Sequence, residues 1–209
     1  MKRSFLPRKT EGVLIKFDFM IKAMYKDRDR VVDILAASFD DNKSVNYIVK
    51  QDKKRKQRIR KLMAYSFDIC YLYGEVFLTD DKEACALVLY PDKKKTTLKS
   101  ILLDVQLIFS CIGIENIKKA LDRESKIKQL QAKDLMYYLW FIGVDSECQN
   151  QGIGSELLKN IIKDSDCKKR SVYLETSTLK NLPWYKKFGF QIYNELDLSY
   201  KLFFLKRDE

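Results

Sequence analysis

The stretch MYYLWFIGVDSECQNQGIGSELLKNII, residues 136–162, decides the fold of this chain. Residues 136–144 are apolar almost without interruption, which is typical of a strand covered on both faces. After a polar loop, apolar side chains return at helical spacing at Ile153, Leu157, Leu158, Ile161 and Ile162. The stretch therefore predicts the central strand of a sheet, a glycine-bearing loop and a helix.

The loop between this strand and this helix has the features of a phosphate site. The N-terminus of a helix presents unpaired backbone N–H groups and a positive dipole end. Gly152 and Gly154 let a ligand approach where a Cβ would collide. The loop fits neither the Walker A pattern nor the three-glycine dinucleotide pattern, and it reads Q-x-x-G-x-G. Alone, this pattern fits either a phosphate site or a tight connection.

Outside this stretch, hydrophobic periodicity predicts the remaining elements. Upstream it predicts a strand near 19–24, a helix near 27–38, a helix that follows the basic run 53–61 and ends at Gly74 as its C-cap, a hairpin of 75–79 with 84–90, and helices near 96–112 and 115–130. Downstream it predicts strands near 172–177, 190–196 and 199–206 and a short helix near 182–188. This order indicates one α/β (α+β) domain on a mixed sheet over residues 19–209, and residues 1–18 are interpreted as an N-terminal extension.

The composition excludes several chemistries. The 209 residues contain no histidine, so a Ser-His-Asp triad, a Cys-His pair and an imidazole metal ligand are all excluded. The five cysteines form no C-x-x-C pair, which fits neither a disulfide framework nor a zinc ribbon, and we expect no metal. No signal peptide or run of about 20 apolar residues is found, so we expect a cytoplasmic protein without membrane attachment.

Three motifs together resemble one known family. The Q-x-x-G-x-G loop is followed by the strand Leu-Glu-Thr-Ser at 174–177 and by Asn-Leu-Pro-Trp-Tyr at 181–185, with Gly-Phe at 189–190. This combination resembles the GCN5-related N-acetyltransferase (GNAT) superfamily, and the segments within residues 174–190 look most like its puromycin N-acetyltransferase type. The resemblance is sharp over residues 136–190 and only topological before them.

The resemblance implies a mixed, mostly antiparallel central sheet with helices on both faces and a splayed strand pair that binds acetyl-CoA. By this resemblance, the pyrophosphate is held by Gln149, Asn150, Gln151, Gly152, Ile153, Gly154 and Ser155. The pantetheine arm pairs with the strand edge at Ile142, Gly143 and Val144, and Asn181 also binds the arm. Asn150-Gln151 stands where the family usually has Gly-Lys or Gly-Arg, so a glycine and a cation are absent from the loop.

Acetyl transfer to an amine needs a base, a hydrogen-bond donor for the carbonyl oxygen and an acid for the leaving thiolate. The resemblance places Tyr185 at the sulfur as the candidate acid, and the Val144 amide is the candidate donor. Glu175 is a candidate base, and an ordered water is the alternative. Cys148 is interpreted as an ordinary loop cysteine, because no base could activate it.

The sequence therefore predicts an acetyl-CoA-dependent N-acetyltransferase that acts by direct transfer on a primary amine of a small molecule or peptide, as a monomer or homodimer. The alternative is a non-catalytic CoA-binding or nucleic-acid-binding module on the same fold. Lys and Arg exceed Asp and Glu by 40 to 29, a net charge of +11. The basic run 53–61 is nevertheless interpreted as a solvated helix face, and nucleic acid is not the expected partner.

Overall fold

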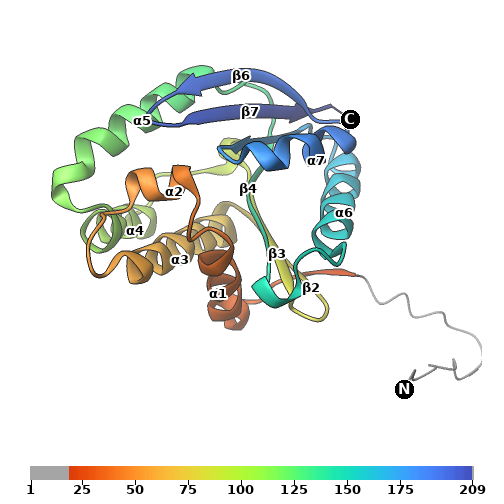
Figure 1. Ribbon diagram of the computed structural model, residues 1–209, viewed down its shortest axis with the longest axis horizontal. Helices are drawn as coiled ribbons and strands as arrows, with labels where there is room; N and C mark the ends of the chain where they lie inside the picture. Colours follow the sequence, from red (N-terminus) through yellow and green to blue (C-terminus); the bar gives the residue numbers. More distant parts are fainter. Residues whose placement is uncertain (1–18, 209) are drawn as a thin grey trace, which may run out of the picture.

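Seven strands form one open sheet in the computed structural model, which describes residues 19–208 (Figure 1). The strand order is β1-β2-β3-β4-β5-β7-β6, and every neighbouring pair is antiparallel except β4 with β5. The strands are β1 (Met20–Lys22), β2 (Gly74–Thr79), β3 (Ala84–Leu89), β4 (Tyr137–Val144), β5 (Val172–Thr176), β6 (Gln191–Asp197) and β7 (Lys201–Arg207). The predicted single domain on a mixed, mostly antiparallel sheet is confirmed, and the predicted extension of residues 1–18 lies outside the described residues.

Helices cover both faces of this sheet. They are α1 (Arg28–Ser38), α2 (Lys43–Ile48), α3 (Arg55–Tyr73), α4 (Leu98–Leu107), α5 (Ile117–Leu130), α6 (Ile153–Cys167) and α7 (Leu182–Lys187). A π-helical segment, Ile108–Ile112, continues α4. The predicted helices near 96–112 and 115–130 are thus present, whereas α2 is an additional helix that the periodicity did not predict.

Three apolar clusters show how the helices are distributed. On one face, α1 and α3 pack on β2, β3 and β4 around Phe67 and Leu87. On the same face, α5 packs on β7 around Phe204 as a separate, smaller cluster. On the opposite face, α6 and α7 pack on the sheet around Leu157 and Leu174. The first face therefore has two separate cores, with the middle of the sheet between them.

The predicted end of the helix at Gly74 is confirmed, because α3 ends at Tyr73 and Gly74 is its C-cap residue. Its φ is −160°, which is extended backbone, and it is the first residue of β2. A Cβ at this position would lie 2.0 Å from the carbonyl oxygen of Val88 on the adjacent strand β3. Glycine is needed here because two backbones approach closely, not because a helix requires a left-handed residue.

Candidate functional site

The sheet opens between β4 and β5. These parallel strands pair only at Tyr137 with Val172 and at Tyr138 with Tyr173, and no later pair joins them in the described chain. The register of β4 against β3 shifts where Trp140 is inserted as an extra residue, and such a bulge increases the local twist of a strand. The predicted splayed strand pair is therefore present, and the edge of β4 beyond Tyr138 faces a gap.

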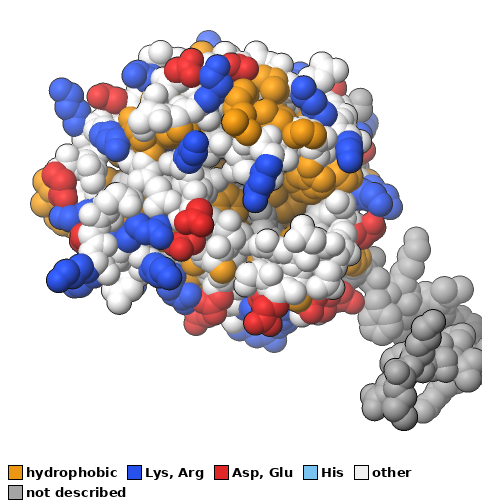
Figure 2. Space-filling view, viewed as in Figure 1, with side chains coloured by type: hydrophobic (Ala, Val, Ile, Leu, Met, Phe, Trp, Pro, Cys, Tyr) orange, Lys and Arg blue, Asp and Glu red, His pale blue; other side chains and the backbone are white. Residues whose placement is uncertain are grey.

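A large cavity occupies this gap. Its volume is about 1540 Å³, and its wall is shared by the loop before α6, by β4 and β5, and by residues of α2, α4, α5 and α7. Figure 2 shows apolar side chains in a hollow near the centre of one face, with Lys and Arg side chains around it. Typical small-molecule pockets have volumes of about 300–1,000 Å³, so this cavity has room for two substrates to meet.

The loop before α6 exposes its backbone amides. Asn150 and Gly152 have positive φ values of 63° and 87°, and Gly152 is the N-cap residue of α6. No hydrogen bond between described residues uses the amides of residues 149–154, while those of Ser155 and Glu156 bond to the carbonyl of Gly152. Six adjacent donors at a positive helix end are the arrangement that binds phosphates.

The two glycines of this loop act differently. A Cβ on Gly152 would have no atom within 4 Å, so the space beside it is open. A Cβ on Gly154 would lie 3.2 Å from Cγ2 of Val144, so this glycine lets α6 begin close to the end of β4. The loop contains no cation, and Lys128 and Lys180, which also line the cavity, come from other segments of the chain.

The end of β4 is fixed from the side of α1. Gly143 lies against Leu35 and Ser38, where a Cβ would come within 3.0 Å of both side chains. The carbonyl oxygen of Val144 accepts bonds from Ser38 Oγ (2.9 Å) and Gln149 Nε2 (3.2 Å). The carbonyl is therefore engaged within the protein.

The amide of Val144 also points away from β3. The next amide, that of Asp145, donates to the carbonyl of Glu83 at 2.7 Å, on the β3 side. Because successive amides of a strand point in opposite directions, the amide of Val144 points away from β3 and toward the gap. This orientation agrees with a donor role for Val144. Ile142 is half-buried and lines the same cavity.

Tyr185 lies on α7 with its ring buried, 6% exposed, between Trp184 and Phe190. Burial raises the pKa of its hydroxyl well above the usual 10. The hydroxyl makes no hydrogen bond with a described residue. Every fully buried polar side-chain atom of the described residues has a hydrogen-bond partner, so the hydroxyl oxygen of Tyr185 is not fully buried. The oxygen therefore keeps contact with the cavity that Tyr185 lines.

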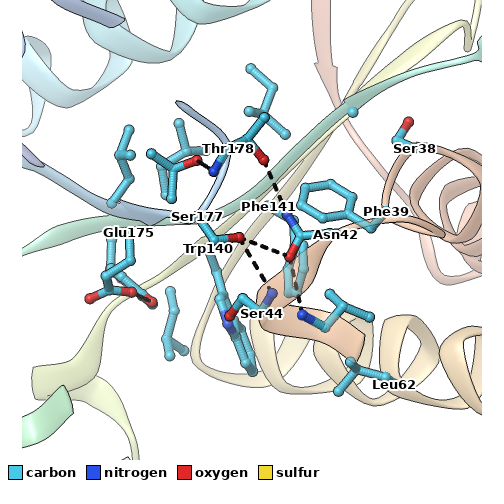
Figure 3. A pocket seen from close by; sticks show the side chains of 18 of the residues that line it. Ser38, Phe39, Asn42, Ser44, Leu62, Trp140, Phe141, Glu175, Ser177 and Thr178 are labelled. Atoms are coloured by element: carbon cyan, nitrogen blue, oxygen red, sulfur yellow. Dashed lines mark hydrogen bonds between the residues drawn. The ribbon is translucent and has the colours of Figure 1, made fainter. Parts of the chain in front are cut away.

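Glu175 lies on β5 at the gap and lines the same cavity (Figure 3). Its carboxylate accepts a hydrogen bond from Gln131 Nε2 at 2.8 Å and a short one from the hydroxyl of Tyr138. Burial is the largest influence on the pKa of Glu175 and raises it above 4.5, against the opposing effect of these two bonds. The carboxylate has no cationic partner in an ion pair within residues 19–208, unlike a structural carboxylate paired with lysine.

Helix α7 and the start of α6 are joined. Trp184 Nε1 donates to Ser155 Oγ at 3.0 Å, and this bond leaves the hydroxyl proton of Ser155 available to a ligand. Asn181, the N-cap residue of α7, lines the cavity, and its side chain makes no hydrogen bond with a described residue. Gln151 Nε2 bonds weakly to the carbonyl of Glu147 at 3.4 Å and is exposed.

Helix α2 contributes to one wall of the cavity. Asn42 caps it and reaches Thr178 Oγ1 at 3.5 Å, and Ser177 Oγ accepts from the amide of Ser44 at 3.4 Å (Figure 3). Segments more than 130 residues apart in sequence thus form one wall. Sequence reasoning missed this wall, and the only local signal for it was the capping residue Asn42.

The basic run 53–61 and Cys148 are the remaining predicted features, and of these only Cys148 lines the cavity. In the basic run, Arg55, Arg58 and Arg60 form ion pairs with aspartates, as expected of a solvated helix face. Burial and Glu83 raise the pKa of the Cys148 thiol, which disfavours the reactive thiolate.

Residues 19–208 contain neither a cluster of metal ligands nor a single helix that could span a membrane. No group of three Cys, Asp or Glu side chains there is arranged to hold a metal ion. No single described helix is long and apolar enough to span a membrane, although the bent pair Leu98–Ile112 and Ile114–Leu130 meets the length and composition criteria.

Comparisons with known proteins identify the fold. Residues 111–192 match the family model described as an acetyltransferase (GNAT) domain. A structure from Corynebacterium glutamicum, described as histone acetyltransferase HPA2 and related acetyltransferase, is 18% identical with a TM-score of 0.68, covering 91% of this chain and 96% of its own. Arylalkylamine N-acetyltransferase 2 from Aedes aegypti is 15% identical with a TM-score of 0.59, covering 90% and 97%. An N-acetyltransferase from Staphylococcus aureus is 18% identical with a TM-score of 0.56, covering 90% and 100%. The chain therefore has the GNAT fold and carries, at residues 111–192, a match to the GNAT acetyltransferase domain.

Proposed function

We propose that this protein is an acetyl-CoA-dependent N-acetyltransferase that transfers an acetyl group directly to an amine of a small molecule or peptide. The observation that carries the proposal is a single cavity that joins the open edge of β4 to the unpaired amides at the start of α6. An extended ligand can pair with a free strand edge while its phosphates bind at a helix N-terminus. The match to the GNAT domain supports the same assignment.

The residues around the gap fit acetyl-CoA. The amides of Gln149, Asn150, Gln151, Gly152, Ile153 and Gly154, with the hydroxyl of Ser155, would hold the pyrophosphate. The strand edge at 142–144 would pair with the pantetheine arm, and the side-chain amide of Asn181 would bind the same arm. Because the Val144 carbonyl is already engaged by Ser38 and Gln149, Val144 pairs through its N–H.

When bound, acetyl-CoA supplies the acetyl group as a thioester, whose C–S bond breaks as the new C–N bond forms. Glu175 takes the proton that the amine must lose, because its raised pKa brings the carboxylate closer to the working pH than an ordinary glutamate. The N–H of Val144 hydrogen-bonds the carbonyl oxygen as charge develops there.

Tyr185 gives its proton to the departing sulfur. A phenol with a pKa of about 10 and a thiol near 8.5 differ by about 1.5 units, or roughly 2 kcal/mol. Burial raises the pKa of Tyr185, and burial alone also raises the pKa of the thiols of Cys70 and Cys85 in this protein. Burial disfavours the charged form of a phenol and of a thiol alike, so it acts in the same direction on the acid and on the leaving group.

A pair of variants at Gly152 tests the phosphate site. Asp and Asn both tolerate positive φ, and the space beside Gly152 is open, so both variants should fold. Gly152→Asp places a carboxylate among the donors, and we expect it to weaken acetyl-CoA binding, measured by calorimetry, at least about tenfold more than Gly152→Asn. Equal affinities of the two variants would contradict the assignment.

Thiol release with a panel of amines then tests catalysis. Turnover with any primary amine supports the transferase. Tight acetyl-CoA binding with no turnover on the whole panel would favour the non-catalytic CoA-binding alternative. The likeness to the puromycin type rests on residues 174–190 and does not by itself name the acceptor.

A further inference from the structure

Arg123 differs from every other arginine in residues 19–208. Seven arginines form an ion pair with an aspartate within 4.0 Å, namely Arg28, Arg30, Arg55, Arg58, Arg60, Arg170 and Arg207. Arg123, on α5, has no carboxylate partner within that distance in the described chain. It is half-buried and lines the cavity of the proposed active site.

Neutral groups hold the Arg123 guanidinium in place. Its Nε donates to the hydroxyl of Tyr200 at 3.0 Å, and its Nη2 donates to Ser44 Oγ at 2.6 Å. The Tyr200 hydroxyl in turn donates to Ser44 Oγ at 3.2 Å. The three residues come from α5, α2 and the turn before β7, so the side chain is fixed by three separate segments. Of the five N–H donors of a guanidinium, three are left without a partner in the described chain.

The positive charge of Arg123 acts on the reacting end of the cavity. It lowers the pKa of both Glu175 and Tyr138, against the larger effect of burial on each. The neighbouring Glu124 does not neutralise Arg123, because Glu124 is exposed and its ion-pair partner is Lys128, at 3.8 Å. A partly buried cation that keeps unused donors is in a position to bind an anion.

Building on the proposed function, we infer that the acceptor amine also carries a carboxylate, which Arg123 binds. A guanidinium fork matches a carboxylate in two parallel hydrogen bonds, and such charge-assisted bonds are the strong ones. Trp140 and Phe141 line the same cavity and give the rest of the acceptor an apolar wall. The acceptor class is therefore an amino acid or the carboxyl-terminal end of a short peptide.

Matched acceptors test the charge requirement. Tryptophan is compared with tryptophanamide and tryptamine, and a dipeptide with its amidated form, with rates expressed per neutral amine. We expect kcat/KM to be at least about tenfold higher for the acids than for their uncharged counterparts. A higher kcat/KM for tryptophan would indicate a free amino acid as the acceptor, and a higher kcat/KM for the dipeptide would indicate the carboxyl-terminal end of a peptide. Equal use of acids and amides would overturn the inference.

Variants of Arg123 separate recognition from a structural role. Arg123→Gln should lower kcat/KM for the acids at least about tenfold more than for the amides, while the KM for acetyl-CoA stays unchanged. Arg123→Lys keeps the charge without the guanidinium fork, so its kcat/KM for the acids should lie between the values of the parent protein and of Arg123→Gln. The control is Arg60→Gln, because Arg60 is an exposed residue paired with Asp33 on α1.

A purely structural Arg123 would give a different result. Arg123→Gln would then depress acids and amides equally, and the double variant Ser44→Ala with Tyr200→Phe would depress them to the same extent. Either outcome refutes the inference and leaves the transferase in place. If no amine is acetylated and acetyl-CoA does not bind, the proposed function itself fails.

Discussion

The indole nitrogen of Trp184 donates a hydrogen bond of 3.0 Å to the hydroxyl oxygen of Ser155. This bond joins α7, which carries Tyr185, to the first turn of α6, where the phosphate loop ends. The candidate acid and the candidate phosphate site are therefore connected by a direct side-chain hydrogen bond, in addition to the apolar packing of α6 and α7. A substitution at Trp184 should therefore affect both the phosphate site and the position of Tyr185.

Trp184→Phe keeps an aromatic ring beside Tyr185 and Phe188 and removes only the hydrogen bond. We expect the KM for acetyl-CoA to rise about fivefold, because one hydrogen bond contributes about 1 kcal/mol. Steady-state kinetics with acetyl-CoA varied provides the measurement. As a control, Trp140→Phe should change the KM of the acceptor and leave that of acetyl-CoA alone. An unaltered acetyl-CoA KM in Trp184→Phe would show that the bond does not position the loop.

Tyr185→Phe should lower kcat by about 100-fold, within the range for the loss of a general acid. The free energy of unfolding should stay unchanged, since the hydroxyl has no hydrogen-bond partner among the described residues. Kinetics and urea denaturation of the same preparation provide both measurements. Turnover at the parental rate at neutral pH would rule out the acid role.

Glu175→Gln tests the base through its pH profile. A base works only when deprotonated, so activity is lost as the pH falls through the pKa of the folded protein, which burial places above 4.5. In Glu175→Gln this acidic limb should disappear, and kcat/KM at pH 7 should fall by about 10²-fold or more. If a water takes the proton, Glu175→Gln retains both the rate at pH 7 and the loss of activity at low pH.

Gly74→Ala should destabilise the protein by more than about 2 kcal/mol, because its Cβ would lie 2.0 Å from the carbonyl oxygen of Val88. Gly152→Ala is the matched control. It has open space, and only its positive φ makes it unfavourable, at roughly 1 kcal/mol. Urea denaturation measures the free energy of unfolding of both variants. Equal losses of stability would mean that the close approach of β3 is not the reason for glycine at position 74.

The sequence predicts the elements that have long periodic patterns. The strand that ends at Val144 and the helix through Leu157 and Ile161 lie where the apolar spacing places them. Short elements cannot be predicted from periodic patterns. Helix α2 has six residues, too few for a periodic pattern, and it is held by distant contacts between Asn42 and Thr178.

Two features of the site depend on tertiary structure alone. Strand alternation places Trp140 and Phe141 on opposite faces, but the bulge puts both on the α1 and α3 side, with their ring centroids 5.6 Å apart. Arg123 looks like one basic residue among many in a chain of net charge +11. Only the tertiary structure shows that the other arginines of residues 19–208 form ion pairs and that Arg123 does not.

The short pairing of β4 with β5 makes the two halves of the sheet incomplete without a third component. A ligand that pairs with the open edge of β4 supplies backbone hydrogen bonds that the chain itself does not make there. Its binding then adds to the stability of the folded state by RT ln(1 + [L]/Kd), about 2.7 kcal/mol at a ligand concentration of 100 Kd. The proposed ligand acetyl-CoA would thus join the two halves of the sheet and raise the stability of the fold.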